Sequence, residues 1–315
     1  MTEKLTEEQR ILAFENYDEC MSCGNKYQEG DICHLGFDEN NEPLYVCEEC
    51  SNKLKKTTVR YVHSPRPYEI PPPENKLWRY TDFTKYVSML TTNGLFFNRA
   101  DFFQDTFEGA KGLKKKEGKW DAYYLNFLRK AIRSAPKGQD LNSSDEEVEK
   151  QAKRLLKDLK RNGENIKKRT FINCWHENEH ESEAMWRLYS SYIDYAIAVR
   201  TSYNSLYHAL GRNPSINIGR VNYIDFENNF AGVNDSFWHK RKSFEHEREV
   251  RAIIVNFNIT DKGIIAPCDL SLLIEEVYIS PSAPGWFTKL VNDVNEKFGI
   301  KAKVSPSKIN QKPFF

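Results

Sequence analysis

The stretch KRKSFEHEREVRAIIVNF, residues 240–257, decides how the second half of the chain is interpreted. Its apolar end, 250–257, is rich in β-branched residues and predicts a buried strand. Three carboxylates, Glu245, Glu247 and Glu249, stand at alternate positions directly before it. Alternate side chains of an extended chain point to the same side, so we expect the three carboxylates on one side of a strand. Such a cluster predicts either cross-strand ion pairs with the interspersed arginines or a catalytic site.

The rest of the second half has the pattern of an α+β domain. Amphipathic helices are predicted between short segments rich in β-branched and aromatic residues. This arrangement predicts a central, mostly antiparallel sheet. The other predicted strands are 77–80, 95–98, 170–175, 195–200, 219–223 and 276–280. The predicted helices include 81–94, 120–134, 284–299 and a segment that starts with a Ser144–Glu147 capping box and ends at Gly163.

Composition describes a folded protein of aqueous compartments. Of the 315 residues, 39% are hydrophobic and 29% are charged, and no apolar run reaches the 18 or so residues of a membrane span. The first ten residues are polar and lack the pattern of a signal peptide. Seven cysteines without an export signal predict a reducing compartment, and we expect the protein to be cytoplasmic.

The net charge is only +1, but basic residues are concentrated in one segment. Residues 111–169 contain 18 Lys or Arg against 9 Asp or Glu. We interpret 111–168 as a charged helical insertion. Its basic excess is typical of solvated helix faces, and it is also compatible with a surface that contacts nucleic-acid phosphates.

Four cysteines near the N-terminus have the spacing of a zinc ribbon. Cys20 and Cys23 form one pair, and Cys47 and Cys50 form a second pair after 23 intervening residues. Two such pairs can close a tetrahedral site for structural Zn(II). We therefore predict a zinc-ribbon module at 1–60, a linker at 61–76 with five prolines in its last fourteen residues, and an α/β domain at 77–315.

Three motifs of the second domain follow one another in the order 103–108, 174–189 and 247–251. Together they resemble a bacterial family known as domain of unknown function 2971. The resemblance covers about residues 76–310 and implies no activity by itself. Val250 stands where that family has an aromatic residue. The matching residues are Phe103, Asp105, Phe107 and Glu108, then Cys174, Trp175, Met185, Trp186 and Tyr189, and finally Glu247, Glu249 and Arg251.

At the level of fold, the motif order also resembles the ADP-ribosyltransferases, which cleave NAD at its nicotinamide bond. That resemblance implies an Arg or His on the first strand, a polar-aromatic middle strand and a Glu entering a later strand. The counterparts are Arg79 with Tyr80, Cys174 with Trp175, and Glu249. The implied activity is ADP-ribosyl transfer or NAD cleavage, in the setting of a bacterial toxin or a phage-defence effector.

This resemblance assigns a role to each candidate residue. Glu249 would stabilise the oxocarbenium character that develops on the ribose, and Glu247 would orient or deprotonate the acceptor. Arg79 would pair with the pyrophosphate. The aromatic residues that would stack on nicotinamide or adenine are Tyr80, Trp175 and Tyr189.

Two other functions compete with the transferase. The zinc ribbon and the basic insertion could form a module that binds nucleic acid or protein without catalysis. Alternatively, His176, Glu177 and His180 have the spacing of a zinc-dependent hydrolase, which requires these residues on a helix. They follow a predicted strand directly, and this context disfavours the helix.

Overall fold

A computed structural model describes most of the chain and divides it into two compact units. The described residues are 20, 22–26, 34–37, 43–54, 60–63, 68–133, 144–190, 193–213, 215–233 and 235–314. The first unit comprises Met1–Pro67, Gly118–Lys160 and Arg212–Pro214. The second comprises Tyr68–Glu117, Arg161–Gly211 and Ser215–Phe315.

The first unit contains a small antiparallel sheet with strand order β2-β1-β3. Its strands are β1 (His34–Phe37), β2 (Pro43–Val46) and β3 (Arg60–His63), and helix α2 (Glu48–Leu54) follows β2. Strands β1 and β2, which lie between the two cysteine pairs in the sequence, pair with each other. Strand β3 extends to His63, inside the segment predicted as a linker.

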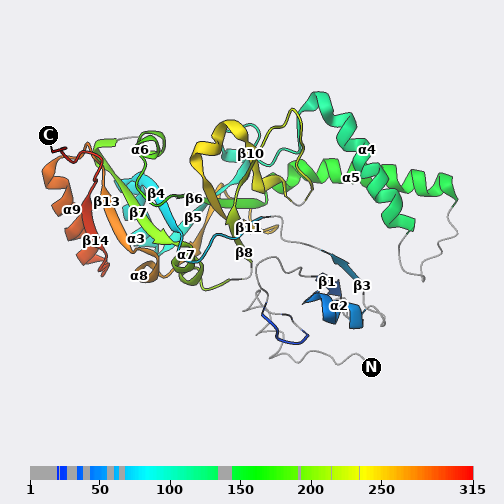
Figure 1. Cartoon of the computed structure of the whole chain (residues 1–315), viewed down its shortest axis with the longest axis horizontal. Coiled ribbons are helices and arrows are strands. Elements are labelled where there is room, and N and C mark those ends of the chain that lie inside the picture. The colour runs from blue at the N-terminus through cyan, green and yellow to red at the C-terminus, as the bar shows by residue number, and fades with distance from the viewer. Residues whose placement is uncertain are drawn as a thin grey trace. The chain divides into compact units, whose positions relative to one another are not determined.

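The charged insertion forms two long helices, α4 (Glu117–Arg133) and α5 (Asp145–Lys167), which lie antiparallel to each other (Figure 1). Ion pairs along their length join Arg129 with Glu149 and Lys160 with Asp121. The predicted capping box is confirmed, because Ser144 and Glu147 exchange backbone-to-side-chain hydrogen bonds. The helix continues past Gly163, so the predicted end was wrong. A glycine inside a helix costs about 1 kcal/mol, which flanking turns can offset.

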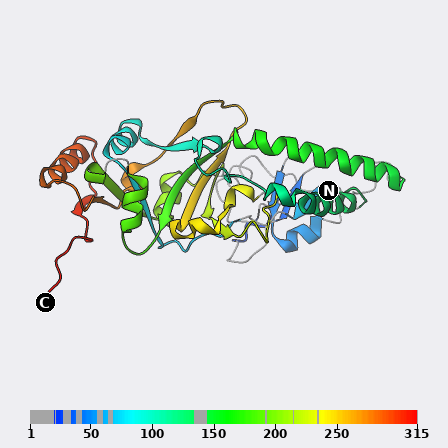
Figure 2. The ribbon, with the colours of Figure 1, turned by 90° about the horizontal axis from the view of Figure 1, so that it is seen from above.

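The second unit is built on a nine-stranded, mostly antiparallel sheet, which confirms the α+β class (Figure 2). A path of seven strands runs β12-β5-β6-β4-β7-β13-β14, and β11 pairs with β6 and β8. Only β13 and β14 are parallel among these pairs. The strands are β4 (Lys76–Asp82), β5 (Gly94–Arg99), β6 (Thr170–Glu177), β7 (Ala196–Ser202), β8 (Ile216–Arg220), β11 (Glu249–Val255), β12 (Gly263–Pro267), β13 (Glu276–Ile279) and β14 (Lys303–Pro306). Two further strands, β9 (Asn222–Ile224) and β10 (His239–Arg241), form a separate parallel pair.

Strand β6 is the branch point of this sheet. Strand β11 pairs along one edge of β6, from Glu249 to Val255. On the other edge, β4 pairs only at Glu177 and His176, and β5 pairs only at Ile172 and Phe171. The strands β4 and β5 therefore diverge along β6 and leave a seam beside residues 173–175, where neither contributes ladder pairs.

One face of the sheet carries the main hydrophobic core. Leu77, Trp175 and Val250 lie on it. Core residues from four helices pack against this face, whereas α6 and the last turns of α5 lie on the opposite face, α6 beside Trp78 and Tyr80. The helices of the second unit are α3 (Phe83–Thr92), α6 (Glu183–Tyr189), α7 (Tyr203–Ala209), α8 (Leu270–Leu273), α9 (Gly285–Lys297) and the last turns of α5. In the part of the chain that the structure describes, no helix is both long and apolar enough to cross a membrane.

The stretch that precedes β11 differs from its predicted form. Residues Lys242–Glu247 form a 3-10 helix, and Arg248 takes a left-handed conformation with φ of 39°. The prediction that Glu245, Glu247 and Glu249 share one side of an extended strand was therefore wrong. Glu245 is exposed, whereas Glu247 and Glu249 are buried. The turn brings Glu247 back to Lys240, which an extended chain could not do.

Candidate functional site

The sheet face opposite the main core carries Glu249. The register pairs Trp78 with His176 and His176 with Glu249, so the three side chains form a row across β4, β6 and β11. Arg251 lies on the same face, two residues further along β11. This row, with the groups that contact it, is called the Glu249 face below.

Two buried cations hold the carboxylate of Glu249. Arg251 Nε donates to Glu249 Oε1 at 2.6 Å, and Lys240 Nζ donates to Oε2 at 3.2 Å. Lys240 also donates to Glu247, so it joins the two glutamates that the sequence singled out. Arg251 in turn makes a bidentate pair with Glu108, at 2.7 and 2.8 Å. Arg251 is fully buried, and these groups form one continuous ion-pair chain.

The electrostatics of this chain keep Glu249 ionised. Burial alone would raise the pKa of Glu249, but the charges of Arg251 and Lys240 outweigh it and lower the pKa to about 2. Burial similarly opposes the charge of Lys240, yet Glu249 and Glu247 raise the pKa of Lys240 above its usual value. At neutral pH the carboxylate of Glu249 therefore remains an anion and cannot serve as a proton donor.

Aromatic hydroxyls surround the two glutamates. Tyr223 Oη accepts from the backbone N–H of Glu249 at 2.8 Å. Burial and the neighbouring charges of Glu247 and Glu249 raise the pKa of Tyr189, which is at the end of α6. The ring of Tyr189 remains partly exposed, so it forms an accessible border of the Glu249 face. Burial also raises the pKa of Tyr223, as does the charge of Glu249.

Tyr80 lies on the same side of the sheet. Its ring centroid is 6.3 Å from that of His176 and 5.0 Å from that of Trp186. Its hydroxyl accepts from the backbone N–H of Ser182, the N-cap residue of α6. Four of the six predicted catalytic and cofactor-binding residues are thus on one side: Tyr80, Tyr189, Glu247 and Glu249.

Arg79 and Trp175 lie on the opposite side, so they do not share a cleft with Glu249 as the resemblance implied. Both are offset by one residue from the row of Trp78, His176 and Glu249, so strand alternation directs them to the main core. The guanidinium of Arg79 lies 5.8 Å from the ring centroid of Trp175. Arg79 Nη1 also donates to the carbonyl of Cys174 at 3.1 Å, inside the seam between β4 and β6. Arg79 therefore satisfies a carbonyl that β4 leaves without a ladder partner.

Several members of the site were not assigned to it from the sequence. Lys240, Glu108 and Tyr223 come from separate segments, and only the fold brings them to Glu249. Glu108 belongs to the first of the three motifs found in the sequence, which forms a turn with Asp105. The same turn is tied to β10, because Arg241 donates to Asp105 at 2.7 Å. The motif therefore marked Glu108 as a residue of interest, but it did not show that Glu108 pairs with Arg251.

The residues with hydrolase spacing do not form a helical site. His176 lies within β6, and His180 is in an exposed turn. Glu177 pairs with Arg220 and accepts from Asn75. Among the described residues, the metal-ligating groups that gather closely enough to share an ion are those of the cysteine cluster.

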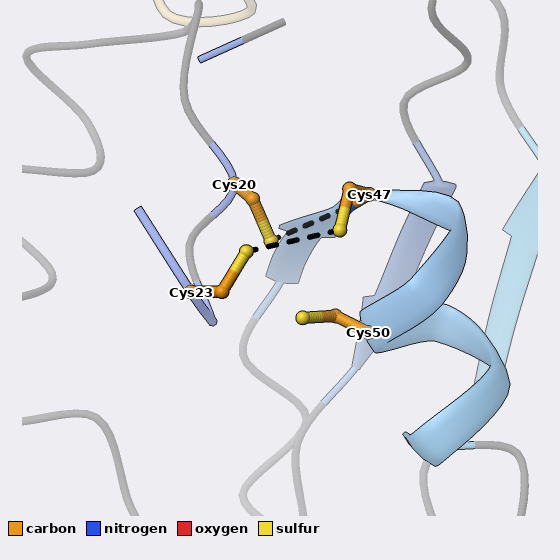
Figure 3. A group of neighbouring side chains, drawn as sticks. All are labelled: Cys20, Cys23, Cys47 and Cys50. Atoms are coloured by element: carbon orange, nitrogen blue, oxygen red, sulfur yellow. Dashed lines mark hydrogen bonds between the residues drawn. The ribbon is translucent and has the colours of Figure 1, made fainter. Parts of the chain in front are cut away.

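The four predicted cysteines come together in the first unit (Figure 3). Their sulfur atoms all lie within 4.8 Å of one another, and the sulfurs of Cys23 and Cys47 are 3.8 Å apart. Tetrahedral Zn(II) with bonds of about 2.3 Å requires sulfurs about 3.8 Å apart. Backbone N–H groups of Ser22 and Cys47 donate to Cys20 Sγ, which favours a thiolate. The residues fit a metal ion.

The basic cluster Lys114–Lys116 is compensated by carboxylates. Lys114 pairs with Glu117, and both Lys115 and Lys116 pair with Glu227. These lysines do not form an isolated positive patch, which weakens the interpretation of this segment as a phosphate-binding surface.

Comparisons with known proteins give one distant likeness. No family model matches the chain. No curated protein matches it. Among solved structures, it is similar to Thermus sp. 2.9 DarT in complex with ADP-ribosylated ssDNA, with a TM-score of 0.34 and 9% identity over 76% of this chain and 98% of that chain. A likeness this distant carries no argument about function.

Proposed function

We propose that the Glu249 face is the active site of an NAD-dependent ADP-ribosyltransferase-like enzyme, which transfers ADP-ribose to an acceptor or cleaves NAD. One observation carries the proposal. The three segments that suggested this activity in the sequence lie on the adjacent strands β4, β6 and β11, where Tyr80, His176 and Glu249 share one face and Arg79 and Trp175 face the other. Glu249, on the last of them, is an anion that two cations hold in place beside aromatic side chains.

The charge balance of the face supports a cationic substrate. Three buried carboxylates, Glu108, Glu247 and Glu249, meet only two buried cations, Lys240 and Arg251. The ion-pair chain has one negative charge in excess when all five groups are ionised, although burial raises the pKa of Glu108 and so opposes its ionisation. The nicotinamide ring of NAD is a pyridinium cation, and the ribose gains positive charge as the bond to it breaks. An uncompensated anion stabilises both species.

The chemistry follows from these positions. The C1′–N bond of NAD breaks, and its electron pair leaves with nicotinamide. The C1′ carbon then forms a bond to an oxygen or nitrogen of the acceptor, or to water, which loses a proton. The carboxylate of Glu249 stabilises the ribose cation, and Glu247 orients the acceptor. Tyr80 and Tyr189 border the nicotinamide half, whereas Arg79 and Trp175 have structural roles at the seam.

Incubation of the protein with NAD tests this function. We expect nicotinamide to be released over time, with ADP-ribose either free in solution or attached to an added protein or nucleic-acid acceptor. Chromatography of the small molecules measures the release. If neither product forms with any acceptor class, the proposed function is wrong.

We also propose that the cysteine cluster binds one structural Zn(II), which stabilises the small sheet of the first unit. We expect about one zinc per chain by elemental analysis, lost in Cys47→Ser because three sulfurs no longer complete the tetrahedron. Cys268→Ser, a buried cysteine of the second unit, is the matched control and should retain the metal. Zinc retained by Cys47→Ser, or lost equally from both variants, would contradict the assignment.

A further inference from the structure

His176 has a buried ring nitrogen that no protein group satisfies. The side chain is 6% exposed, and its Nδ1 lies 2.6 Å from the carbonyl oxygen of Glu247. A carbonyl only accepts hydrogen bonds, so Nδ1 carries the proton and donates it. Nε2 of the neutral ring is then an acceptor. It is buried and, among the residues that the structure describes, has no hydrogen-bond partner.

The position of this nitrogen points to a ligand. His176 lies directly opposite Glu249 in the register, and the ring of Tyr80 is 6.3 Å away. A buried acceptor without a partner has lost its hydrogen bonds to water and gains none in return, which destabilises the folded state. The neighbouring carboxylate of Glu249 is fully engaged, with contacts to Arg251 and Lys240. In this row, Nε2 of His176 thus has no partner, whereas the carboxylate of Glu249 beside it has its hydrogen bonds satisfied.

Protonation of the ring does not remove the need for a partner. Burial lowers the pKa of His176, so the ring stays neutral at physiological pH. Among the described residues, His176 belongs to no group of three or more His, Cys, Asp or Glu side chains that are close enough to share a metal ion. The unmet group is thus a hydrogen-bond acceptor that needs a donor.

We propose that His176 Nε2 binds the substrate on the Glu249 face by accepting a hydrogen bond from the nicotinamide riboside half of NAD; this inference rests on the proposed function. The half offers two kinds of donor, the ribose hydroxyls and the carboxamide N–H. His176 is then a substrate-binding residue, whose proton arrangement is fixed by Glu247, and it selects for substrates that carry the donor.

The test compares substrates with and without each donor. 3-Acetylpyridine adenine dinucleotide lacks the carboxamide N–H without gaining a charge, and deoxyribose forms of NAD lack one hydroxyl of the nicotinamide riboside. We expect wild type to have a kcat/KM roughly 10–100-fold lower for the analogue that lacks the relevant donor, because the buried acceptor stays unpaired. The analogue that is discriminated against identifies the donor.

Two variants separate binding from folding. The amide of His176→Asn can still donate to the Glu247 carbonyl, but it has no atom at the Nε2 position. The ratio of kcat/KM between NAD and the analogue should therefore fall to about one, while the thermal unfolding temperature stays near that of wild type. Gln in His176→Gln reaches the Nε2 position and should restore part of the discrimination. His180→Asn makes the same change in an exposed histidine and should behave as wild type.

The outcomes distinguish a failure of the role of His176 from a failure of the proposed transferase function. If wild type cleaves NAD and folded His176→Asn discriminates as wild type does, the role of His176 is wrong and the function stands. If wild type discriminates against none of the analogues, the role of His176 is equally wrong. If wild type neither binds nor cleaves NAD, both proposals are wrong.

Discussion

Glu249→Gln is expected to lower the rate of nicotinamide release at least about 100-fold, which is the typical loss when one preorganised electrostatic group is removed from a transition state. Gln has the size of Glu but no charge, so it leaves the ribose cation without its anion. The rate is measured by chromatography at saturating NAD. Glu245→Gln makes the same change at an exposed carboxylate in the preceding 3-10 helix, and this variant should retain the wild-type rate.

A loss of folded protein has to be separated from a loss of chemistry in this variant. Glu249 also pairs with Arg251 and Lys240, so its neutralisation weakens the domain. Glu108→Gln disturbs the same buried arginine from its other side and serves as the stability comparison. Rates are therefore expressed per folded molecule, from unfolding curves of each variant. A rate for folded Glu249→Gln within threefold of wild type would contradict the role of Glu249.

Arg251→Met is expected to lower the free energy of unfolding of the second unit by about 3–5 kcal/mol, because it leaves Glu108 and Glu249 buried without their shared cation. Arg251 is 0% exposed, so water cannot replace the lost contacts. Urea unfolding followed by tryptophan fluorescence measures the change. An effect of this size would be among the largest that a single substitution gives.

The matched control for that measurement is Arg187→Met on α6. Arg187 pairs with Glu183 one turn away, and both side chains are largely exposed. An exposed pair of this kind contributes less than about 1 kcal/mol. Equal effects of Arg187→Met and Arg251→Met would show that the ion-pair chain does not stabilise the domain.

The sequence was most informative where the pattern is local. The strands at 77–80, 170–175 and 250–257 were found within a few residues, because β-branched and aromatic residues mark them. The two cysteine pairs were sufficient to predict that the four sulfurs lie together, because the sequence spacing within each pair suits tetrahedral coordination of one ion. Strands β12 and β14 were missed, because they are short and parts of them remain exposed.

The sequence failed where the outcome depends on register and turns. The sequence indicated Glu247 and Glu249 as a pair. Their shared contact with Lys240 depends on a 3-10 turn and on the left-handed conformation of Arg248, and hydrophobic periodicity predicts neither. The separation of Arg79 from Glu249 depends on which residue of β6 faces which residue of β4 and β11. A shift of one residue would have reversed it.

The most direct test of the proposed active site is a crystal structure of Glu249→Gln grown with NAD. The Glu249 face should hold the nicotinamide riboside half, with the side chain at position 249 within hydrogen-bond distance of the ribose and Tyr80 beside the bound half. NAD bound on another surface, or no NAD at concentrations that saturate the reaction of the wild-type protein, would contradict the assignment of this face as the active site.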